Sequence, residues 1–469
     1  MKKQVLSALA FCSALGIAQA QTDVTKEYLV NPSFETLKAA DGTTDVAVKT
    51  KLENGLYGWE ISKLLDNQFS NYQVESEASG SSTGIPANGI IKPSQGEFYY
   101  FNRQGWGNVD GSELKTSTSK NLPIGTYYAV IDYKAADFSN NNDASKSGTT
   151  IGIKAENATN ELLGENTAVR RAYSTLTSNS DPYMVNAAWN ELGTMFTVTE
   201  PTTVTISLVQ NMKNSGRSDI AWDNLRLYKI EDVSEKCPMD VSGLITTSNY
   251  YAFGGWNIEG GNTFQVNTWS TEGENDGSGM TTPFIEDHVG KENKAANATI
   301  SHTVSHLIPG IYEVSGLIRV LNEDGGDNPS GATLYANEGS TNACNGEPCT
   351  NGVYGTYIVK GTVGTDGVLT FGIKVANANF NWVSFKNFKL QYLGAASIEQ
   401  LQATLQEKIE EAKAYAENCP KGIAAIVNAA ITQGDNAQPT EESLNAAIAA
   451  LTQAIALAEE TAPATEAFK

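Results

Sequence analysis

Two short stretches of the sequence decide the fold: residues 122–127 read LPIGTY and residues 307–312 read LIPGIY. In each, Pro and Gly precede a Tyr that opens a strand-like run, YYAVI at 127–131 and YEV at 312–314. Pro and Gly are typical of turns, and short alternating or β-branched runs are typical of strands with one buried face. The two stretches therefore predict one turn-to-strand unit that occurs twice in the chain.

Further matched stretches lie on either side of this unit. Residues 222–227 (WDNLRL) match residues 385–390 (FKNFKL), each a closing strand with its apolar residues on one face. Gly58-Trp59 is matched by Gly255-Trp256. Short runs broken by Gly, Asn, Asp and Pro fill the sequence around these stretches. We therefore expect two tandem copies of one antiparallel β-sandwich, so that the protein is mainly β.

The C-terminal part has a different period. From Ser397 onward the apolar residues recur every three to four positions, which indicates helices. Ser397 and Gln400 form a capping-box pattern, a second apolar stripe ends at Gly434, and Thr440 followed by Glu441 opens a third. We expect a three-helix bundle whose polar faces carry no catalytic cluster.

The N-terminus has the pattern of a cleaved secretory signal. Lys2 and Lys3 precede an apolar run at 5–17 and then AQA at 18–20, the order of charged, apolar and small residues in such signals. The residue before Cys12 is not small, as a lipoprotein cleavage site requires. No later run approaches the ~20 apolar residues that span a bilayer. We expect an exported protein without a transmembrane segment, in the periplasm or outside the cell.

These patterns divide the chain into a signal peptide (1–20), a first sandwich (21–232), a second sandwich (233–394) and a helical bundle (395–469). The 469 residues include 32 Lys plus Arg against 53 Asp plus Glu, a formal net charge of −21. Because nucleic acid phosphates need a basic surface, this balance argues against a nucleic acid partner.

Four cysteines follow the signal segment. Cys344 and Cys349 bracket the turn-forming stretch NGEP, so we expect either a local disulfide between them in an oxidising compartment or two thiols. Cys237 and Cys419 either pair with each other or stay reduced. The Cys and His residues are too dispersed for a zinc site.

The first sandwich resembles a known family in three motifs. Residues 31–35 (NPSFE), Gly58-Trp59 and residues 221–225 (AWDNL) resemble the opening and closing signatures of secreted carbohydrate-binding modules with the galactose-binding-like jelly-roll fold. The resemblance covers this sandwich from end to end. It implies a jelly-roll that binds a glycan, but it does not identify the sugar.

The second sandwich and the tail have resemblances of their own. Residues 269–273 (WSTEG), 280–284 (MTTPF) and 381–385 (NWVSF) resemble the same superfamily, in a form common in exported proteins of gut Bacteroidetes. The second sandwich departs from the first in lacking the Asn-x-x-Phe-Glu opening. The helical tail is similar to FIVAR-type bundles, which serve as spacers in bacterial surface and polysaccharide-processing proteins.

The resemblance of the first sandwich also implies a structural calcium ion. Modules of this type often hold Ca²⁺ where the opening segment crosses the closing strand, and Glu35 and Asp223 occupy the matching positions. Calcium takes six to eight oxygen ligands, which these carboxylates and backbone carbonyls would supply. The alternative is that the carboxylates are solvated or cap backbone groups. Lys386, at the position of Asp223, argues against such a site in the second sandwich.

The tryptophans divide by whether both copies share them, since flat aromatic faces and polar groups together bind neutral glycans. We expect four to lie in the core: Trp59, Trp222, Trp256 and Trp382. Three are not shared and lie in predicted loops, where rigid sandwiches usually carry binding. We therefore expect Trp106 with Tyr100 and Arg103, and also Trp189, to bind in the first sandwich, and Trp269 in the second. The alternative for each is a lid over the core.

No motif predicts catalysis. Residues 80–84 (GSSTG) fit a nucleophile elbow, but they lie in a Ser/Gly-rich loop and not between a strand and a helix. His302 and His306 lack the Glu of a zinc-protease motif. We therefore expect a non-catalytic, exported protein that binds a polysaccharide or glycan. The alternatives are a surface adhesion or structural protein with a protein partner, for example through the helical tail, and third a glycoside hydrolase or an accessory part of one.

Overall fold

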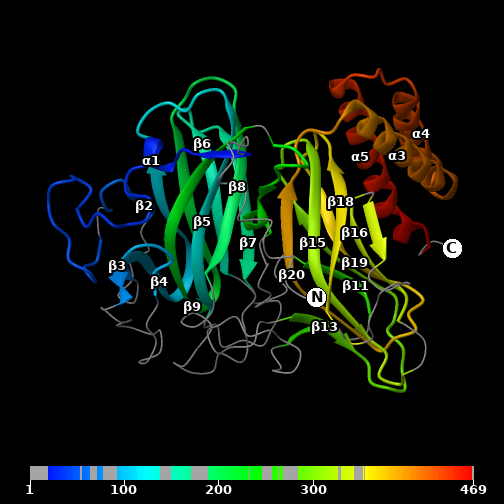
Figure 1. Ribbon diagram of the computed structural model, residues 1–469, viewed down its shortest axis with the longest axis horizontal. Helices are drawn as coiled ribbons and strands as arrows, with labels where there is room; N and C mark the ends of the chain where they lie inside the picture. Colours follow the sequence, from blue (N-terminus) through cyan, green and yellow to red (C-terminus); the bar gives the residue numbers. More distant parts are fainter. Residues whose placement is uncertain are drawn as a thin grey trace, which may run out of the picture.

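The protein consists of two β-sandwiches followed by three helices that lie beside the second sandwich (Figure 1). The predicted fold class, mainly β with antiparallel sheets and a C-terminal helical bundle, is therefore confirmed. The computed structural model describes residues 20–52, 55–63, 71–77, 92–137, 149–170, 189–231, 233–245, 256–261, 264–267, 284–325, 329–337, 339–342, 352 and 354–466.

The first sandwich is built from long, bent strands. β4 and β9 pair along most of their lengths, from Tyr100 opposite Trp222 to Ser117 opposite Thr205, so both strands contribute to the two layers. Its described elements are β1 (Gln21–Asp23), α1 (Thr25–Tyr28), β2 (Glu60–Lys63), β3 (Asn71–Ser76), β4 (Phe98–Ser117), β5 (Gly125–Asp137), β6 (Thr149–Asn157), β7 (Leu162–Arg170), β8 (Asn190–Val198) and β9 (Val204–Ile230). The central strand order is β2-β4-β9-β5-β8.

The opening motif of the first sandwich is held by the Gly-Trp motif. Trp59 Nε1 donates to the Asn31 carbonyl over 2.8 Å, and the Trp59 ring stacks on Phe34 with centroids 4.8 Å apart. Gly58 has φ +81°, and a Cβ there would lie 2.3 Å from the Val30 carbonyl oxygen, so only Gly fits. The tryptophans expected in the core, Trp59, Trp222, Trp256 and Trp382, are all buried.

The second sandwich has two separate sheets, ordered β12-β13-β20-β15-β18 and β11-β14-β19-β16-β17. Its described elements are β10 (Met239–Asp240), η4 (Ser242–Leu244), β11 (Trp256–Gly260), β12 (Phe264–Asn267), β13 (Phe284–His288), β14 (Ala298–Val304), β15 (Gly310–Leu321), β16 (Ala332–Ala336), β17 (Gly339–Asn342), β18 (Gly355–Val363), β19 (Leu369–Val375) and β20 (Trp382–Tyr392). β10 pairs with the end of β20.

Two local structures occur at matched positions of both sandwiches. The Tyr127 and Tyr312 hydroxyls each donate over 2.9 Å to the carbonyl four residues earlier. Asn224 and Asn387 both have φ +54°, and at each the pairing with β5 or β15 shifts register. Two residues then oppose one, which defines a β-bulge. The repeated sequence motifs thus have the same backbone geometry in both sandwiches.

The connection between the sandwiches is part of a hydrophobic core. Met239, Val241 and Leu244 are buried in one cluster with Tyr128 and Val130 of β5 and with the core of the second sandwich. The Tyr312 hydroxyl also lies 3.7 Å from the Met195 sulfur of β8. The two sandwiches therefore pack against each other through this segment.

The three helices are α3 (Ile398–Asn418), α4 (Lys421–Asp435) and α5 (Glu441–Glu466), and they pack around a shared apolar core. The predicted capping box is present, because Ser397 Oγ accepts from Gln400 N and the Gln400 side chain accepts from Ser397 N. The Thr404 and Thr362 hydroxyls are 3.1 Å apart, which joins α3 to β18. Among the described helices, none is long and apolar enough to cross a bilayer.

Candidate functional site

One face of the first sandwich carries buried polar side chains, which we call the first polar face. Side chains alternate along strands, so Tyr100, Tyr133 and Trp222 fill the core while their neighbours point to the other side of the same sheet. The first polar face consists of Glu75, Tyr99, Asp132, Lys134 and Asp223, each no more than 5% exposed. Burying charges is costly unless they are paired or hydrogen-bonded, so their partners define what this face does.

Asp223 binds a backbone segment that crosses the first polar face. Its carboxylate accepts from Ser94 N over 2.8 Å, from Gln95 N over 3.0 Å and from Asn224 N over 2.7 Å. Burial raises the pKa of Asp223 from 3.8 to about 8, although the three N–H donors act in the opposite direction. Asn224 itself has a left-handed backbone, with φ +54°.

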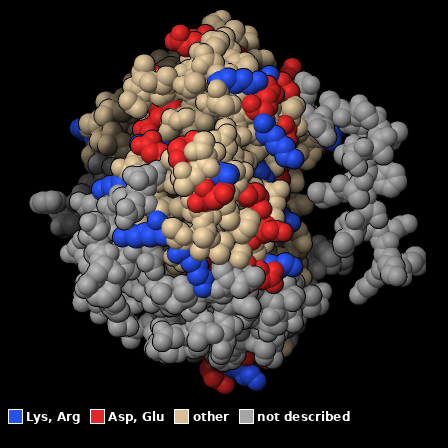
Figure 2. Space-filling view, turned by 90° about the vertical axis from the view of Figure 1, so that its left-hand side faces the viewer, with Lys and Arg blue, Asp and Glu red and all other residues tan. Residues whose placement is uncertain are grey.

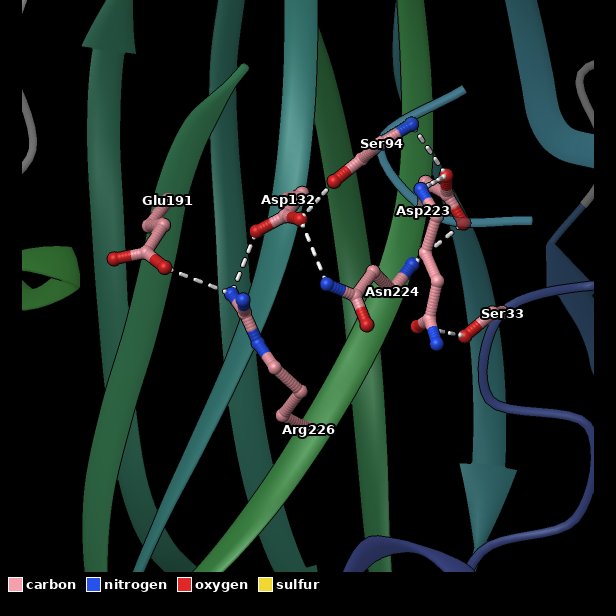
Figure 3. A network of polar contacts seen from close by, with 8 residues as sticks. Ser33, Ser94, Asp132, Glu191, Asp223, Asn224 and Arg226 are labelled. Carbon is pink, nitrogen blue, oxygen red and sulfur yellow. Dashed lines mark hydrogen bonds and ion pairs between the residues drawn. The ribbon is translucent and has the colours of Figure 1, made fainter. Parts of the chain in front are cut away.

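A chain of polar contacts continues from Asp223 across β5 and β8 (Figure 3). Asp132 on β5 accepts from Arg226 over 2.6 Å, from Asn224 Nδ2 over 2.9 Å and from the Ser94 hydroxyl. Arg226 also donates to Glu191 on β8 over 2.9 Å. Burial raises the pKa of Glu191, and the Arg226 guanidinium opposes that rise. The network fixes the 94–95 segment to three strands.

Glu35 binds the same segment from its other side. Both of its carboxylate oxygens lie 3.1 Å from Glu97 N, and one lies 3.1 Å from Phe98 N. Gly96, between the two attachment points, has φ +69°, and a Cβ there would lie 2.3 Å from the Glu35 carboxylate. Residues 94–98 are thus held between the Asp223 and Glu35 carboxylates.

The geometry of these carboxylates differs from that of a calcium site. Glu35 and Asp223 point their oxygens at backbone N–H donors, whereas Ca²⁺ requires oxygens with free lone pairs. No group of three or more His, Cys, Asp and Glu residues in the described part of the chain is arranged to hold a metal. As placed, the residues do not fit the ion, and the calcium site stays a prediction of the resemblance.

Trp189 lies at the edge of the first polar face, directly before β8. The residue is partly exposed, its Nε1 donates to the Lys92 carbonyl over 3.0 Å, and its ring centroid is 6.3 Å from that of Tyr99. Lys134 Nζ lies 5.4 Å from the centre of the indole. The Tyr99 hydroxyl donates to Glu75 over 2.8 Å, and burial followed by the Glu75 charge raises the pKa of Tyr99. An aromatic ring, a carboxylate and an ammonium group therefore lie together.

The other predicted site residues lie elsewhere. Tyr100 is in the core of the first sandwich, stacked on Phe34, so its ring is not presented at a surface. The prediction that Trp106 lies in a loop is wrong, because β4 runs through it. The flanking glycines suggested a loop, but they accompany register shifts within the strand. Arg103 also belongs to β4, opposite Asn71 of β3.

Several predicted residues lie outside the residues that the structure describes: the signal peptide, Trp269, Cys344 and Cys349. The thiols of Cys237 and Cys419 are not joined to each other.

The second sandwich has a corresponding face, which we call the second polar face: Glu286, Arg319, Tyr354, Trp382 and Lys386. Trp382 Nε1 donates to Glu286 over 2.8 Å, and the Arg319 guanidinium lies 4.4 Å from the Trp382 ring centre. Lys386 Nζ lies 4.6 Å above the Tyr354 ring. The Trp382 ring is 8% exposed. This face combines the same types of group as the first.

Strand register relates the two faces residue by residue. In the first sandwich Lys134 pairs with Ala221, the residue before Trp222. In the second sandwich Arg319 pairs with Ser384, the residue before Phe385, which is the counterpart of Trp222. Each face contains a carboxylate bound over 2.8 Å by an aromatic side chain, and a cation beside an indole. Sequence reasoning named Asp223 and Lys386 but missed the other charged members of the two faces: Glu75, Asp132, Lys134, Glu286 and Arg319. A Lys or Arg at an alternate position inside a β-branched strand was the available signal.

Comparisons with known proteins give structural similarities only. No family model and no curated protein matches the chain. Similar structures include a Stig cyclase from Fischerella sp. TAU in complex with an indole compound, at 11% identity over 43% of this chain and 95% of that chain, with a TM-score of 0.28. The module TmCBM61 in complex with beta-1,4-galactotriose is 14% identical over 43% of this chain and 97% of that chain, with a TM-score of 0.25.

The tandem CBM22-1-CBM22-2 domain of Paenibacillus barcinonensis Xyn10C is 10% identical over 81% of this chain and 100% of that chain, with a TM-score of 0.23. At TM-scores of 0.23 to 0.28, these similarities decide nothing about ligand or activity.

Proposed function

We propose that the protein is an exported, non-catalytic glycan-binding protein that recognises its ligand at the edge of the first polar face. The observation that carries this proposal is the partly exposed Trp189, whose ring lies beside Tyr99 and Lys134, with Glu75 bonded to Tyr99. A sugar ring stacks its C–H surface on an indole, and the buried Lys134 and Tyr99 hold the Trp189 indole in position. The helical tail then acts as a spacer.

The hydrogen bonds that the buried carboxylates already accept from the protein support a binding role without catalysis. Glycoside hydrolysis needs two carboxyl groups that face the scissile bond from either side. Asp132 is held by Arg226, Asn224 and Ser94, and Asp223 accepts three backbone N–H groups. On the side of the first sandwich that Figure 2 shows, the described basic and acidic residues are interspersed and form no basic stripe that would bind a polyanion.

Affinity electrophoresis in gels that contain plant or mucin glycans tests the proposal. We expect retardation by at least one neutral glycan, and its loss in Trp189→Ala and Lys134→Met. Tyr57→Ala is the matched control, because Tyr57 is an exposed aromatic of the same sandwich that lies outside the face. Trp106→Ala and Trp269→Ala test the remaining predicted aromatics.

Two results would overturn the proposal. One is the absence of retardation by any glycan. The other is capture of a protein partner that persists after glycosidase treatment and is insensitive to Trp189→Ala, which would favour an adhesion protein. Release of reducing sugar from a substrate panel would favour a glycoside hydrolase.

A further inference from the structure

A short backbone segment at the edge of the first polar face binds the Trp189 indole, and we call this segment, residues 92–98, the strap. Its first residue, Lys92, accepts from Trp189 Nε1 through its carbonyl over 3.0 Å. Its last residue, Phe98, opens β4 and is followed by Tyr99, whose ring centroid lies 6.3 Å from that of Trp189. The indole is therefore in contact with the residue at one end of the strap and with the residue that follows its other end.

Buried carboxylates hold the strap two residues beyond Lys92. Asp223, which is fully buried, accepts from Ser94 N over 2.8 Å and from Gln95 N over 3.0 Å. The Ser94 hydroxyl donates to Asp132, and Figure 3 shows Ser94 directed at both carboxylates. The strap is therefore fixed close to the carbonyl that binds Trp189.

Pro93 couples these carboxylates to the indole. The Lys92 carbonyl belongs to the planar peptide bond before Pro93, and the Ser94 N–H belongs to the one after it. The proline ring fixes φ at about −65°, so only ψ of Pro93 remains free between the two groups. The direction of the Lys92 carbonyl therefore depends on where Asp223 holds Ser94.

We infer that the strap positions the Trp189 indole for ligand binding, with Asp223, Ser94 and Pro93 as positioning residues. Asp223 is fully buried, so it acts on a ligand only through the strap and the indole. An indole that is already held in place loses less conformational entropy when a sugar stacks on it. This inference rests on the proposed function of the first polar face, and it adds the residues that set the geometry of that site.

Fluorine NMR of the full chain labelled with 5-fluorotryptophan tests the inference without a ligand. Trp189→Phe identifies the Trp189 signal by its loss. Ser94→Ala removes the hydroxyl that binds Asp132, while the same Asp132 oxygen still accepts from Asn224 Nδ2 over 2.9 Å, so the variant should fold. We expect its Trp189 signal to shift or broaden, and the signal of Trp256, in the core of the second sandwich, to stay unchanged. All samples contain chelator, so that no cation replaces a hydrogen bond.

Pro93→Ala tests the coupling through the strap. It frees φ and removes no hydrogen bond donor, so the Trp189 signal should broaden with little loss of stability. Pro201→Ala is its control, because it makes the same exchange in the exposed connection between β8 and β9. Ser117→Ala is the control for Ser94→Ala, because it removes a hydroxyl that lies 2.9 Å from the Thr205 hydroxyl at the far end of β4. Both controls should leave the Trp189 signal unchanged.

Affinity electrophoresis measures the consequence for binding, in gels that contain β-1,4-galactan, xyloglucan or gastric mucin. Ser94→Ala and Pro93→Ala should raise the Kd of each glycan that retards the parent by about threefold to tenfold, the loss expected when one side chain has to be ordered on binding. Pro201→Ala and Ser117→Ala should bind like the parent.

The inference is overturned if the Trp189 signal of both strap variants matches that of the parent, or if the two controls change it as much. Equal Kd values for the parent and both strap variants would also overturn it. If no glycan retards the parent, the proposed function fails, and the fluorine spectra still decide whether the strap positions the indole.

Discussion

The two polar faces occupy the same strands of their sandwiches, but at one matched position the first has an acidic residue and the second a basic one. Asp223 in the first sandwich and Lys386 in the second are both fully buried. Asp223 binds a backbone segment through its N–H groups, whereas Lys386 lies over the Tyr354 ring. The strand and its bulge determine where the side chain points, and the residue type determines what it binds there.

The aromatic groups of the two faces also differ in accessibility. Trp189 is partly exposed, with Lys134 on one side. The Trp382 ring lies between His288, whose ring centroid is 4.3 Å away, and the Arg319 guanidinium at 4.4 Å. The first indole is therefore available to a ligand, while the second is occupied by protein groups on both faces. This difference places the proposed glycan contact on the first sandwich.

Asp223→Ala is expected to have the largest effect on the free energy of unfolding, and it tests most directly what the residue at this matched position does. It removes a buried carboxyl group and leaves the N–H groups of Ser94 and Gln95 without their acceptor, so the free energy of unfolding should fall by about 3 to 5 kcal/mol. Chemical denaturation measures this change. Asp41→Ala is the control, because Asp41 also accepts backbone N–H groups but is exposed. Equal losses in both variants would contradict the role of burial.

Replacement of each indole by Phe tests the difference in accessibility. Trp382→Phe leaves the buried Glu286 without its 2.8 Å donor, so the free energy of unfolding should fall by about 2 to 3 kcal/mol. Trp189→Phe loses only a bond to a carbonyl at a partly exposed position and should cost about 1 kcal/mol. Thermal unfolding of the two variants shows which of them loses more stability. A larger loss for Trp189→Phe would contradict our conclusion that Trp189 is the more accessible of the two indoles.

A pH dependence is expected from Glu113 on β4 of the first sandwich. Burial opposes its ionisation, but the bonds from Ser62, Lys154 and Lys115 outweigh burial and lower its pKa from 4.5 to about 2. Because the pKa is lower in the folded state, the stabilisation is present above pH 4.5 and is lost as the pH falls through about 2.

Glu113→Gln should therefore lower the free energy of unfolding by about 1 kcal/mol at neutral pH, with the difference from the parent vanishing in acid. Urea denaturation as a function of pH measures both curves. A difference that persists undiminished at low pH would show that Glu113 acts through its shape and not its charge.

The smallest effect is expected from calcium. Since the Glu35 and Asp223 oxygens accept backbone N–H groups, the melting temperature should be the same in Ca²⁺ and in chelator. Scanning calorimetry of the parent and of Glu35→Gln measures this. A calcium-dependent rise that is absent from Glu35→Gln would instead support the site implied by the family resemblance.

The fold was predictable because its signals are local. The turn and tyrosine of residues 122–127 and 307–312, and the capping box at Ser397, depend on residues only a few positions apart. The polar faces are not local. Glu75 meets Tyr99 only through the register of β3 and β4, and no pattern within either strand specifies that register.

The sequence was equally unable to predict which individual aromatic side chains face the core. Trp189, predicted from its loop position, does lie at the edge of a polar face, whereas Tyr100 is in the core. Tyr99 and Tyr100 are adjacent and chemically identical, so only the direction of the pleat decides which one faces the polar side. A single sequence does not reveal the phase of that alternation when both neighbours are tyrosine.

The segment from Met239 to Leu244 couples the unfolding of the two sandwiches. Its apolar side chains belong to a cluster that includes Tyr128 and Val130 from one sandwich and Tyr312 from the other. A connection of this kind is not a flexible tether. Loss of either sandwich would expose apolar surface on its neighbour, so heat should melt both in one cooperative transition.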